Sequence, residues 1–286
     1  MLISLLVCTM NRELLLDRCL KSLVRQSYDN FEVIIIDQSD KKLESYSCYL
    51  FESIKYLHIS KKGLSNARNV GLEYVNGDYV CLIDDDAIYP DNWLEKVVQS
   101  LKDNPVSVLC GRTRDLLSGE YGLSGKCDNV IETVSFWKVM SYGISPCLVF
   151  ETKILKRFGF DDRFGVGREW GAGEETDVIW NILEDGGEMR YEPQILVYHP
   201  VISKVKISTD KLASYNLGFG ALFAKHWYEK NNFKAFIYFL YSISRNIVGF
   251  FLYTFKNDIS NKMIQIISFK SKCYGFKCFR NSFRRI

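Results

Sequence analysis

The chain has 286 residues, of which 47% are hydrophobic and 25% charged, so it can bury a sizeable core and is too apolar for wholesale disorder. Its net charge is +3, and its nine cysteines lack the paired spacing of a zinc site, so we interpret them as reduced thiols in a cytosolic compartment. An apolar run begins the sequence without a basic segment or a cleavage site, and a signal peptide is therefore not expected.

Apolar runs alternate with helical stripes over the first two hundred residues. Strands are expected at residues 2–9, 31–37, 56–60, 79–83, 107–112, 146–151 and 195–198. Helices are expected at residues 16–24, 64–74, 93–101, 153–158 and 178–183, with Asp91 as the N-cap of the third. Residues 115–143 are dotted with glycine and serine and are interpreted as a surface excursion. This alternation predicts an α/β fold with a parallel sheet.

Three groups of acidic residues lie at the ends of these predicted strands and loops, or directly after them. They are Asp37, the run Asp84, Asp85 and Asp86, and the group Glu174, Glu175 and Asp177. Ligands of open α/β sheets bind beyond the carboxyl ends of the strands, and Mg²⁺ or Mn²⁺ takes carboxylates together with phosphate oxygens. The alternatives are a solvated acidic turn for the run and, for the last group, acids attracted by the dipole at a helix start.

Two further places in the sequence offer cations or an imidazole. Lys62 and Arg68 surround a predicted helix start with a flexible Gly63, which is typical of an anion site, although an ordinary capped helix gives the same pattern. His199 follows the last predicted strand of this region. It is interpreted either as a satisfied strand-end histidine or as a metal ligand.

The C-terminal part differs in character from the rest. Residues 233–255 are nearly all aromatic or aliphatic, yet Arg245 and Asn246 lie at their centre. An arginine at the middle of a bilayer costs about 2.5–3.5 kcal/mol, so we favour an interfacial helix over a spanning one. Residues 256–286 carry eight lysines and arginines against Asp258 alone, a net charge of +7. An anionic membrane surface is the expected partner of residues 233–286, and packing of this helix onto the body is the alternative.

Seven short motifs occur in an order that resembles a known family. They are LLVCTMNR (5–12), FEVIIIDQS (31–39), GLSNARNVG (63–71), DDD (84–86), FDDRF (160–164), GEETD (173–177) and YHP (198–200). Together they resemble a family 2 glycosyltransferase of the GT-A fold over about residues 1–200. The resemblance implies inverting transfer of a sugar from a nucleotide-sugar, with a UDP-sugar as the expected donor and Mn²⁺ or Mg²⁺ as the cofactor.

The resemblance also assigns roles to residues at matching positions. Thr9, Asn11 and Arg12 would line the nucleotide pocket, Asp37 and Ser39 would meet the base, Arg68 would face the diphosphate, Asp84 and Asp85 would belong to the donor site, and Asp86 with Asp84 and His199 would hold the metal. The family's catalytic base is usually the aspartate of a Glu-Asp pair. Glu175 stands at that position, and Asp177 and Glu174 are its rivals.

These expectations combine into one organisation for the chain. Residues 1–205 would form the GT-A domain, a Rossmann-like mostly parallel sheet flanked by helices, with 1–114 binding the nucleotide-sugar and 115–205 the acceptor. Residues 206–286 would form a helical, aromatic and basic extension. A saccharide or polyprenyl-diphosphate-linked acceptor, a role in surface polysaccharide (capsule or O-antigen) synthesis, a peripheral place on the inner face of the cell membrane, and no nucleic-acid partner are expected. The alternative is a non-catalytic module that binds a nucleotide-sugar or carbohydrate.

Overall fold

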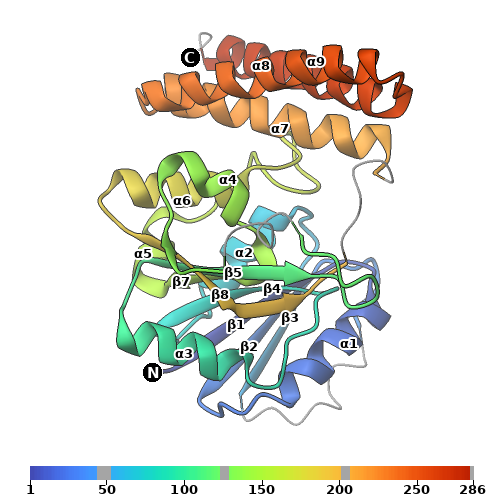
Figure 1. Cartoon of the computed structure of the whole chain (residues 1–286). Helices are drawn as coiled ribbons and strands as arrows, with labels where there is room; N and C mark the ends of the chain where they lie inside the picture. Colours follow the sequence, from blue (N-terminus) through green and yellow to red (C-terminus); the bar gives the residue numbers. More distant parts are fainter. Residues whose placement is uncertain (44–52, 123–128, 201–206, 284–286) are drawn as a thin grey trace. The chain divides into compact units, whose positions relative to one another are not determined.

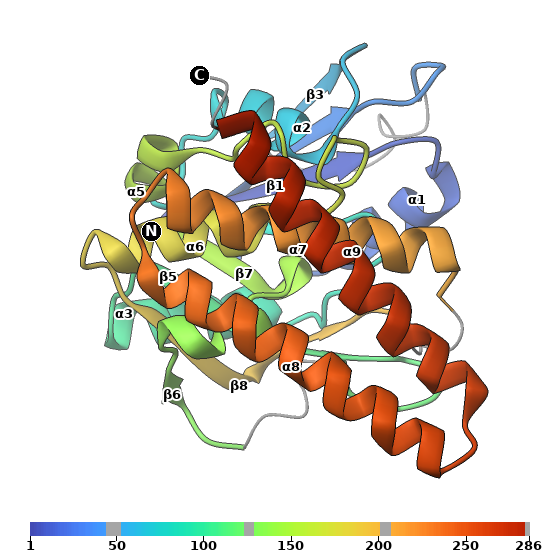
Figure 2. The ribbon, with the colours of Figure 1, turned by 90° about the horizontal axis from the view of Figure 1, so that it is seen from above.

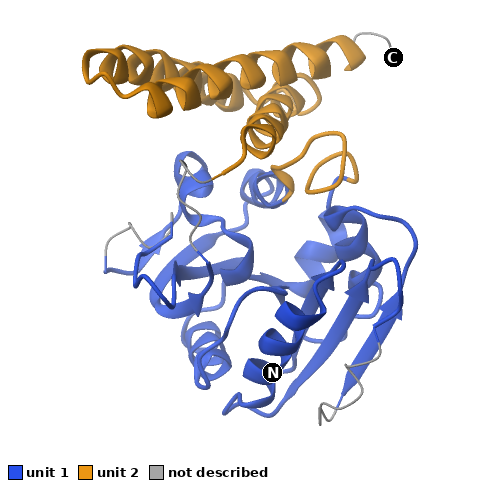
Figure 3. Cartoon of the chain, turned by 90° about the vertical axis from the view of Figure 1, so that its right-hand side faces the viewer, with its two compact units in different colours: residues 1–161, 175–201 blue, residues 162–174, 202–286 orange. Residues whose placement is uncertain are grey.

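The computed structural model describes residues 1–43, 53–122, 129–200 and 207–283 (Figure 1). The chain divides into two compact units, which Figure 3 distinguishes by colour. The first unit comprises residues 1–161 and 175–201, and the second comprises residues 162–174 and 202–286. The boundary predicted after residue 205 lies outside the described residues. The sequence did not indicate that residues 162–174 pack with the C-terminal helices.

The first unit is built on one mixed sheet, whose eight described strands follow the order β3-β2-β1-β4-β7-β5-β8-β6. They are β1 (Ile3–Thr9), β2 (Phe31–Asp37), β3 (Ile54–His58), β4 (Tyr79–Asp84), β5 (Val108–Arg114), β6 (Glu132–Thr133), β7 (Leu148–Glu151) and β8 (Met189–Tyr198). The first four in chain order are parallel, as are β5 and β8, whereas β7 and β6 pair antiparallel with their neighbours. The predicted α/β fold is therefore confirmed.

Helices cover both faces of this sheet (Figure 1). They are α1 (Glu13–Val24), α2 (Leu64–Leu72), α3 (Trp93–Asp103), α4 (Val139–Tyr142), α5 (Thr152–Phe158) and α6 (Glu174–Glu184). Leu5 of β1 belongs to the core cluster that α1 and α3 complete, while its neighbour Leu6 points to α2 on the opposite face. A Cβ on Gly71 of α2 would lie 2.2 Å from Leu6 Cδ1, so glycine permits this close approach.

One local prediction was wrong, and another was only partly right. Asp91 does not cap α3, because Asn92 holds the N-cap position without a side-chain bond and Asp91 instead lies 3.1 Å from Arg25 Nε. The segment 115–143 is not simply a surface excursion, although its residues 123–128 lie outside the described part. It contributes β6, α4 and the buried Phe136, whose ring stacks on Trp180 of α6 at a centroid distance of 4.3 Å.

The second unit consists mainly of three long helices, and Figure 2 shows α8 and α9 running side by side. They are α7 (Thr209–Tyr228), α8 (Phe233–Phe255) and α9 (Ile259–Phe283). A Cβ on Gly220 of α7 would lie 2.1 Å from the Lys272 carbonyl oxygen, and one on Gly275 of α9 would lie 2.1 Å from that of Leu217. The two glycines therefore let the backbones of α7 and α9 approach closely.

The helix α8 keeps most of its apolar surface exposed. Within the described residues, it is the one helix whose length and composition suffice to cross a membrane. Ala235 and Phe239 are its buried residues, and the ring of Phe239 stacks on Phe276 of α9 at 4.2 Å. Its exposed apolar side chains are Phe233, Ile237, Leu240, Tyr241, Ile247, Val248, Phe251, Leu252 and Phe255. The core of the second unit therefore uses one stripe of α8 and leaves the other uncovered.

We predict that Glu32→Gln lowers the free energy of unfolding at neutral pH and loses this effect in acid. Burial would raise the pKa of Glu32, but hydrogen bonds from Ser4 Oγ (2.5 Å) and from Asn76 N (2.6 Å) and Nδ2 (3.0 Å) outweigh it, so its pKa lies below the usual value. Ionised Glu32 therefore stabilises the fold above the unfolded pKa of about 4.3, and this stability is lost as pH falls through the lower folded pKa.

Urea unfolding measures this effect. At pH 7 the variant should lose about 1–3 kcal/mol, and the difference from the wild type should shrink towards pH 3. The exposed Glu73→Gln is the control and should unfold like the wild type at both values. An equal loss at pH 7 and pH 3 would contradict the role of the ionised carboxylate.

Candidate functional site

The parallel register brings polar residues from neighbouring strands to one edge of the sheet. Thr9 of β1 lies beside Asp37 of β2, and Cys8 lies beside Asp84 of β4. Parallel strands end at the same edge, so the residues that follow β1, β2 and β4 gather there. Arg114 of β5 pairs with Tyr198 at the end of β8. His199, which follows Tyr198, therefore lies at the same end of the sheet.

Asp84, Asp86 and His199 form a cluster at this edge. His199 Nε2 lies 3.2 Å from Asp86 Oδ1 and 3.9 Å from Asp84 Oδ2. Two backbone hydrogen bonds between Ile88 and Tyr198, of 2.8 and 2.9 Å, tie the segment after Asp86 to the end of β8. This tie brings the histidine to the aspartates although more than a hundred residues separate them in the sequence.

The three side chains fit a divalent cation. Each offers one ligand atom, and these atoms lie within 4.8 Å of one another. Two carboxylate oxygens and one imidazole nitrogen form a donor set that suits Mn²⁺, while Mg²⁺ favours the oxygens and keeps more of its water. The cluster can therefore hold one ion and leave coordination positions for water or phosphate oxygens.

The proton affinities of the cluster reflect both burial and the mutual attraction of its members. Burial raises the pKa of Asp84 to about 6, even though Arg68 and His199 act in the opposite direction. Burial would lower the pKa of His199, but the hydrogen bond to Asp86 and the charges of both aspartates outweigh it and raise that pKa. The pKa of Asp86 is lowered, because His199 and Arg12 outweigh its burial. The two carboxylates therefore stabilise a positive charge at the cluster.

Asp85, the middle residue of the run, is engaged by two side chains of the chain's first strand and turn. Its Oδ2 accepts from Thr9 Oγ1 at 2.7 Å, and its Oδ1 accepts from Arg12 Nη1 at 2.9 Å. The same Nη1 lies 3.4 Å from Asp86 Oδ2. Thr9 and Arg12 therefore hold the buried Asp85 beside the cluster, and their contact with a nucleotide stays a prediction.

Asp37 is fully buried and is surrounded by donors. Its Oδ1 accepts from the Ser39 backbone at 2.8 Å, and its Oδ2 accepts from the Tyr56 hydroxyl at 2.5 Å and from the Leu43 backbone at 3.3 Å. The Ser39 hydroxyl accepts from the backbone of Asn11 at 2.8 Å. A nucleobase N–H would have to share the carboxylate with Tyr56 or displace it. In the sequence, Tyr56 is marked only as the start of a predicted strand.

Glu175 is the most accessible of the three acids at the start of α6. Glu174 and Asp177 are buried, whereas the side chain of Glu175 is 16% exposed. Its Oε1 accepts from Arg68 Nη1 at 2.9 Å. The structure thus joins Arg68, which was expected to face a diphosphate, to the candidate base. The exposure favours Glu175 over Asp177, since an acceptor hydroxyl must reach the base.

Ser145 connects this pair to the acidic cluster, and no motif in the sequence predicts its role. It begins a short 3-10 helix, Ser145–Cys147, ahead of β7. Its hydroxyl accepts from Arg68 Nη2 at 2.6 Å and donates to Asp84 Oδ1 at 2.7 Å. The sequence marks this serine only by the proline that follows it, which indicates a turn and carries no information about the contact.

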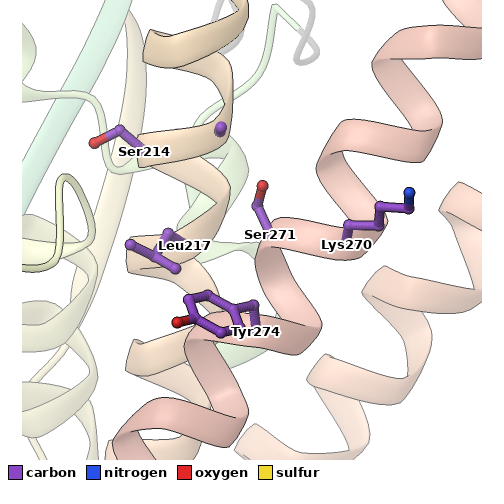
Figure 4. Close-up of a pocket in the computed structure, with 6 residues that line it drawn as sticks. Ser214, Leu217, Lys270, Ser271 and Tyr274 are labelled. Atoms are coloured by element: carbon purple, nitrogen blue, oxygen red, sulfur yellow. The ribbon is translucent and has the colours of Figure 1, made fainter.

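A cavity of about 380 Å³ in the second unit lies between α7 and α9 (Figure 4). Leu217 and Tyr274 line it, while the hydroxyl of Ser214 and the ammonium group of Lys270 point away from each other. None of the described residues that line it carries a carboxylate or an imidazole, so it lacks the chemistry that the carboxyl edge of the sheet offers.

Comparison with known proteins gives a family for this chain's sequence. The model of the family described as "Glycosyl transferase family 2" matches residues 4–158. Among curated proteins, the putative glycosyltransferase EpsH of Bacillus subtilis is 35% identical over 114 residues, which are 38% of this chain and 33% of that protein. The chain spans less than half the length of the first curated relatives that it matches.

Two solved structures are similar to most or all of the chain. The mannosyltransferase PcManGT from Pyrobaculum calidifontis, in complex with GDP-Man and Mn²⁺, has a TM-score of 0.64 at 15% identity and covers 96% of this chain and 86% of its own. S. aureus TarS, in complex with UDP-GlcNAc, has a TM-score of 0.59 at 15% identity, with 100% and 92% covered. At such identities the likeness shows the fold alone, and it confirms the predicted GT-A type.

We predict that the purified chain binds Mn²⁺ and that His199→Ala or Asp86→Asn weakens this binding at least about tenfold, because the first removes a nitrogen donor and the second removes the negative charge of a carboxylate ligand. Electron paramagnetic resonance of free Mn²⁺ during a titration measures the affinity. Asp91→Asn, which removes an exposed carboxylate elsewhere in the same unit, should bind like the wild type. Unchanged affinity in both cluster variants would place the ion elsewhere.

Proposed function

The chain belongs to glycosyl transferase family 2, and on this basis we propose that it transfers one sugar from a nucleotide-sugar, with a UDP-sugar as the donor, to a saccharide or lipid-linked acceptor. One observation carries the proposal. A cluster that fits a divalent cation lies at the carboxyl edge of the sheet and is joined through Ser145 and Arg68 to a partly exposed carboxylate, Glu175. This combination suits the displacement of a nucleoside diphosphate by a hydroxyl, because it offers a base for the hydroxyl and positive charge for the leaving group.

The acidic cluster and Arg68 serve the leaving group. Asp84, Asp86 and His199 would hold Mn²⁺ or Mg²⁺, which when bound supplies positive charge to a departing diphosphate. Arg68 adds a guanidinium that is 3% exposed and therefore keeps its place without water around it. A fixed charge in a buried setting stabilises developing negative charge more strongly than a solvated one. Residues 1–114 would bind the donor and residues 115–205 the acceptor.

Glu175 serves the nucleophile. Its carboxylate takes the proton from the acceptor hydroxyl, whose oxygen attacks the anomeric carbon from the face opposite the nucleotide. This single displacement inverts the anomeric centre. The ion pair with Arg68 fixes the direction of the carboxylate, so that its other oxygen remains for the acceptor. We place the reaction in the synthesis of a surface polysaccharide.

We predict that UDP or a UDP-sugar raises the melting temperature in Mn²⁺ and not in EDTA, and that Glu175→Gln keeps this shift while losing turnover. A ligand at one hundred times its Kd that binds only the folded state stabilises it by about 2.7 kcal/mol. Removal of a general base lowers turnover by about 10²–10⁴-fold. Melting curves and release of the nucleotide from the donor measure the two effects.

The panel should also contain GDP, dTDP and CMP, and Glu184→Gln is the matched control because this exposed carboxylate lies on the same helix. If no nucleotide stabilises the folded protein, the transferase proposal is wrong. Full turnover by Glu175→Gln, when the wild type turns over, would move the role of base to another residue. Stabilisation without turnover in the wild type would favour the non-catalytic binding module.

We further propose that the second unit binds an anionic membrane surface on the cytoplasmic side. Asn246 in the middle of α8 is paired, because its Nδ2 donates to Gln265 Oε1 at 2.8 Å and its Oδ1 accepts from Lys272 Nζ at 3.0 Å. The neighbouring Arg245 is exposed, and its Cζ lies 5.8 Å from the centroid of the Tyr241 ring. The exposed apolar stripe of α8 is left for the acyl boundary. The net charge of +7 over residues 256–286 suits anionic headgroups, with about 1 kcal/mol for each cation near the surface.

We predict that the full chain floats with phosphatidylglycerol vesicles and that Val248→Asp combined with Phe251→Asp lowers the bound fraction several-fold, because the two charges enter the apolar stripe. Leu117→Asp is the control, since Leu117 is 97% exposed in the first unit. Neutral phosphatidylcholine vesicles should bind less of the wild type. Salt-sensitive binding of duplex DNA in place of vesicles would contradict the membrane proposal.

A further inference from the structure

The hydroxyl of Ser145 lies between two groups to which the proposed function gives separate tasks. We propose that Ser145 is a positioning residue, which orients Asp84 towards the cation site and, through Arg68, orients Glu175 towards the acceptor. This inference rests on the proposed function and deepens it. No motif of the sequence contains this serine. The family match covers residues 4–158 without marking individual positions.

The direction of the two hydrogen bonds follows from the chemistry of the groups. A guanidinium can only donate, so the Ser145 oxygen accepts from Arg68 Nη2 at 2.6 Å. The single hydroxyl proton is then donated to Asp84 Oδ1 at 2.7 Å. The other oxygen of the same carboxylate, Oδ2, is the one that lies 3.9 Å from His199 Nε2. Ser145 thus holds Oδ1 and leaves Oδ2 facing the cluster.

Arg68, the donor to the Ser145 hydroxyl, is buried and packs on an aromatic ring. Its side chain is 3% exposed, and its Cζ lies 5.2 Å from the centroid of the Phe160 ring. Phe160 is itself fixed by Asn69, whose Nδ2 donates to the Phe160 carbonyl at 2.7 Å and whose Oδ1 accepts from its backbone N–H at 2.8 Å. The hydroxyl therefore bridges a buried, packed guanidinium and the Asp84 carboxylate.

The guanidinium of Arg68 also contacts Glu175, so the position of Ser145 affects the orientation of the candidate base. Nη2 meets Ser145 and Nη1 meets Glu175 at 2.9 Å, so one planar group is fixed by a contact on each side. Loss of the serine contact removes one of the constraints on this group. The orientation of Glu175 then depends on fewer contacts, which lowers turnover more than it changes donor affinity.

The experiment titrates Mn²⁺ alone into the full chain and its variants, with electron paramagnetic resonance as the readout. Ser145→Ala should raise the Kd for Mn²⁺ about tenfold, because residues that orient metal ligands contribute about 10–100-fold to affinity. Ser145→Thr keeps the hydroxyl and should restore most of it. Ser27→Ala is the matched control, since the exposed Ser27 hydroxyl also donates to a carboxylate, Glu95 Oε2 at 2.9 Å.

A second readout separates positioning from a merely structural role. At saturating Mn²⁺ and donor, Ser145→Ala should lower kcat several-fold with a nearly unchanged KM for the donor. The melting temperature of the metal-free protein shows whether Ser145→Ala folds. If Ser145→Ala does not fold, Ser145→Cys takes its place, because cysteine has a similar volume and forms only weak hydrogen bonds. A lower melting temperature with wild-type Kd and kcat would make Ser145 structural and overturn the proposal.

The outcomes distinguish this inference from the proposed function. A wild type that binds Mn²⁺ and transfers sugar, with Ser145→Ala titrating like the wild type, would overturn only the role of Ser145. A wild type that binds no Mn²⁺ would overturn the cation site and the inference together.

Discussion

Three consecutive carboxylates at the end of a buried strand repel one another, and the site depends on how this repulsion is offset. Each aspartate meets positive charge or a donor from a different part of the chain. Arg12 binds Asp85, Ser145 links Asp84 to Arg68, and His199 lies next to Asp86. These partners follow or precede different strands, so the charge balance of the cluster exists only when the sheet from β1 to β8 is complete. Folding and site assembly are in this sense one event.

The strands and the groups of acidic residues were predictable because their signals are local. A run of apolar residues that ends in Asp37 or Asp84 predicts a buried strand, and the aspartate marks its carboxyl end. The α/β class followed from the alternation of such segments with helical stripes, whereas the GT-A type was implied by the resemblance of the ordered motifs to family 2. The partners of the carboxylates were not predictable in the same way. Tyr56 and Ser145 reach Asp37 and Asp84 through the fold, and no spacing in the sequence joins them.

Other differences have the same physical origin. The short β7 pairs antiparallel with both of its neighbours, which a pattern of apolar residues does not specify. The aromatic content of the C-terminal part predicted its helices. It did not predict that Gly220 and Gly275 bring two helix backbones together, because that contact is made by the absence of side chains. Phe164 and Trp170 likewise pack against Phe279 from a segment more than a hundred residues away.

The position of β7 bears on how the nascent chain matures. β4 and β5 are made first, yet they do not pair with each other in the described sheet, because Leu148–Glu151 is inserted between them. Until these residues leave the ribosome, β4 presents an open row of backbone donors and acceptors, which is the feature that draws chains into misassociation. A protein cut after residue 114 would keep that edge permanently. The strands before and after residue 114 therefore complete one sheet together, and the exposed edge of β4 persists while the interval between β5 and β7 is being translated.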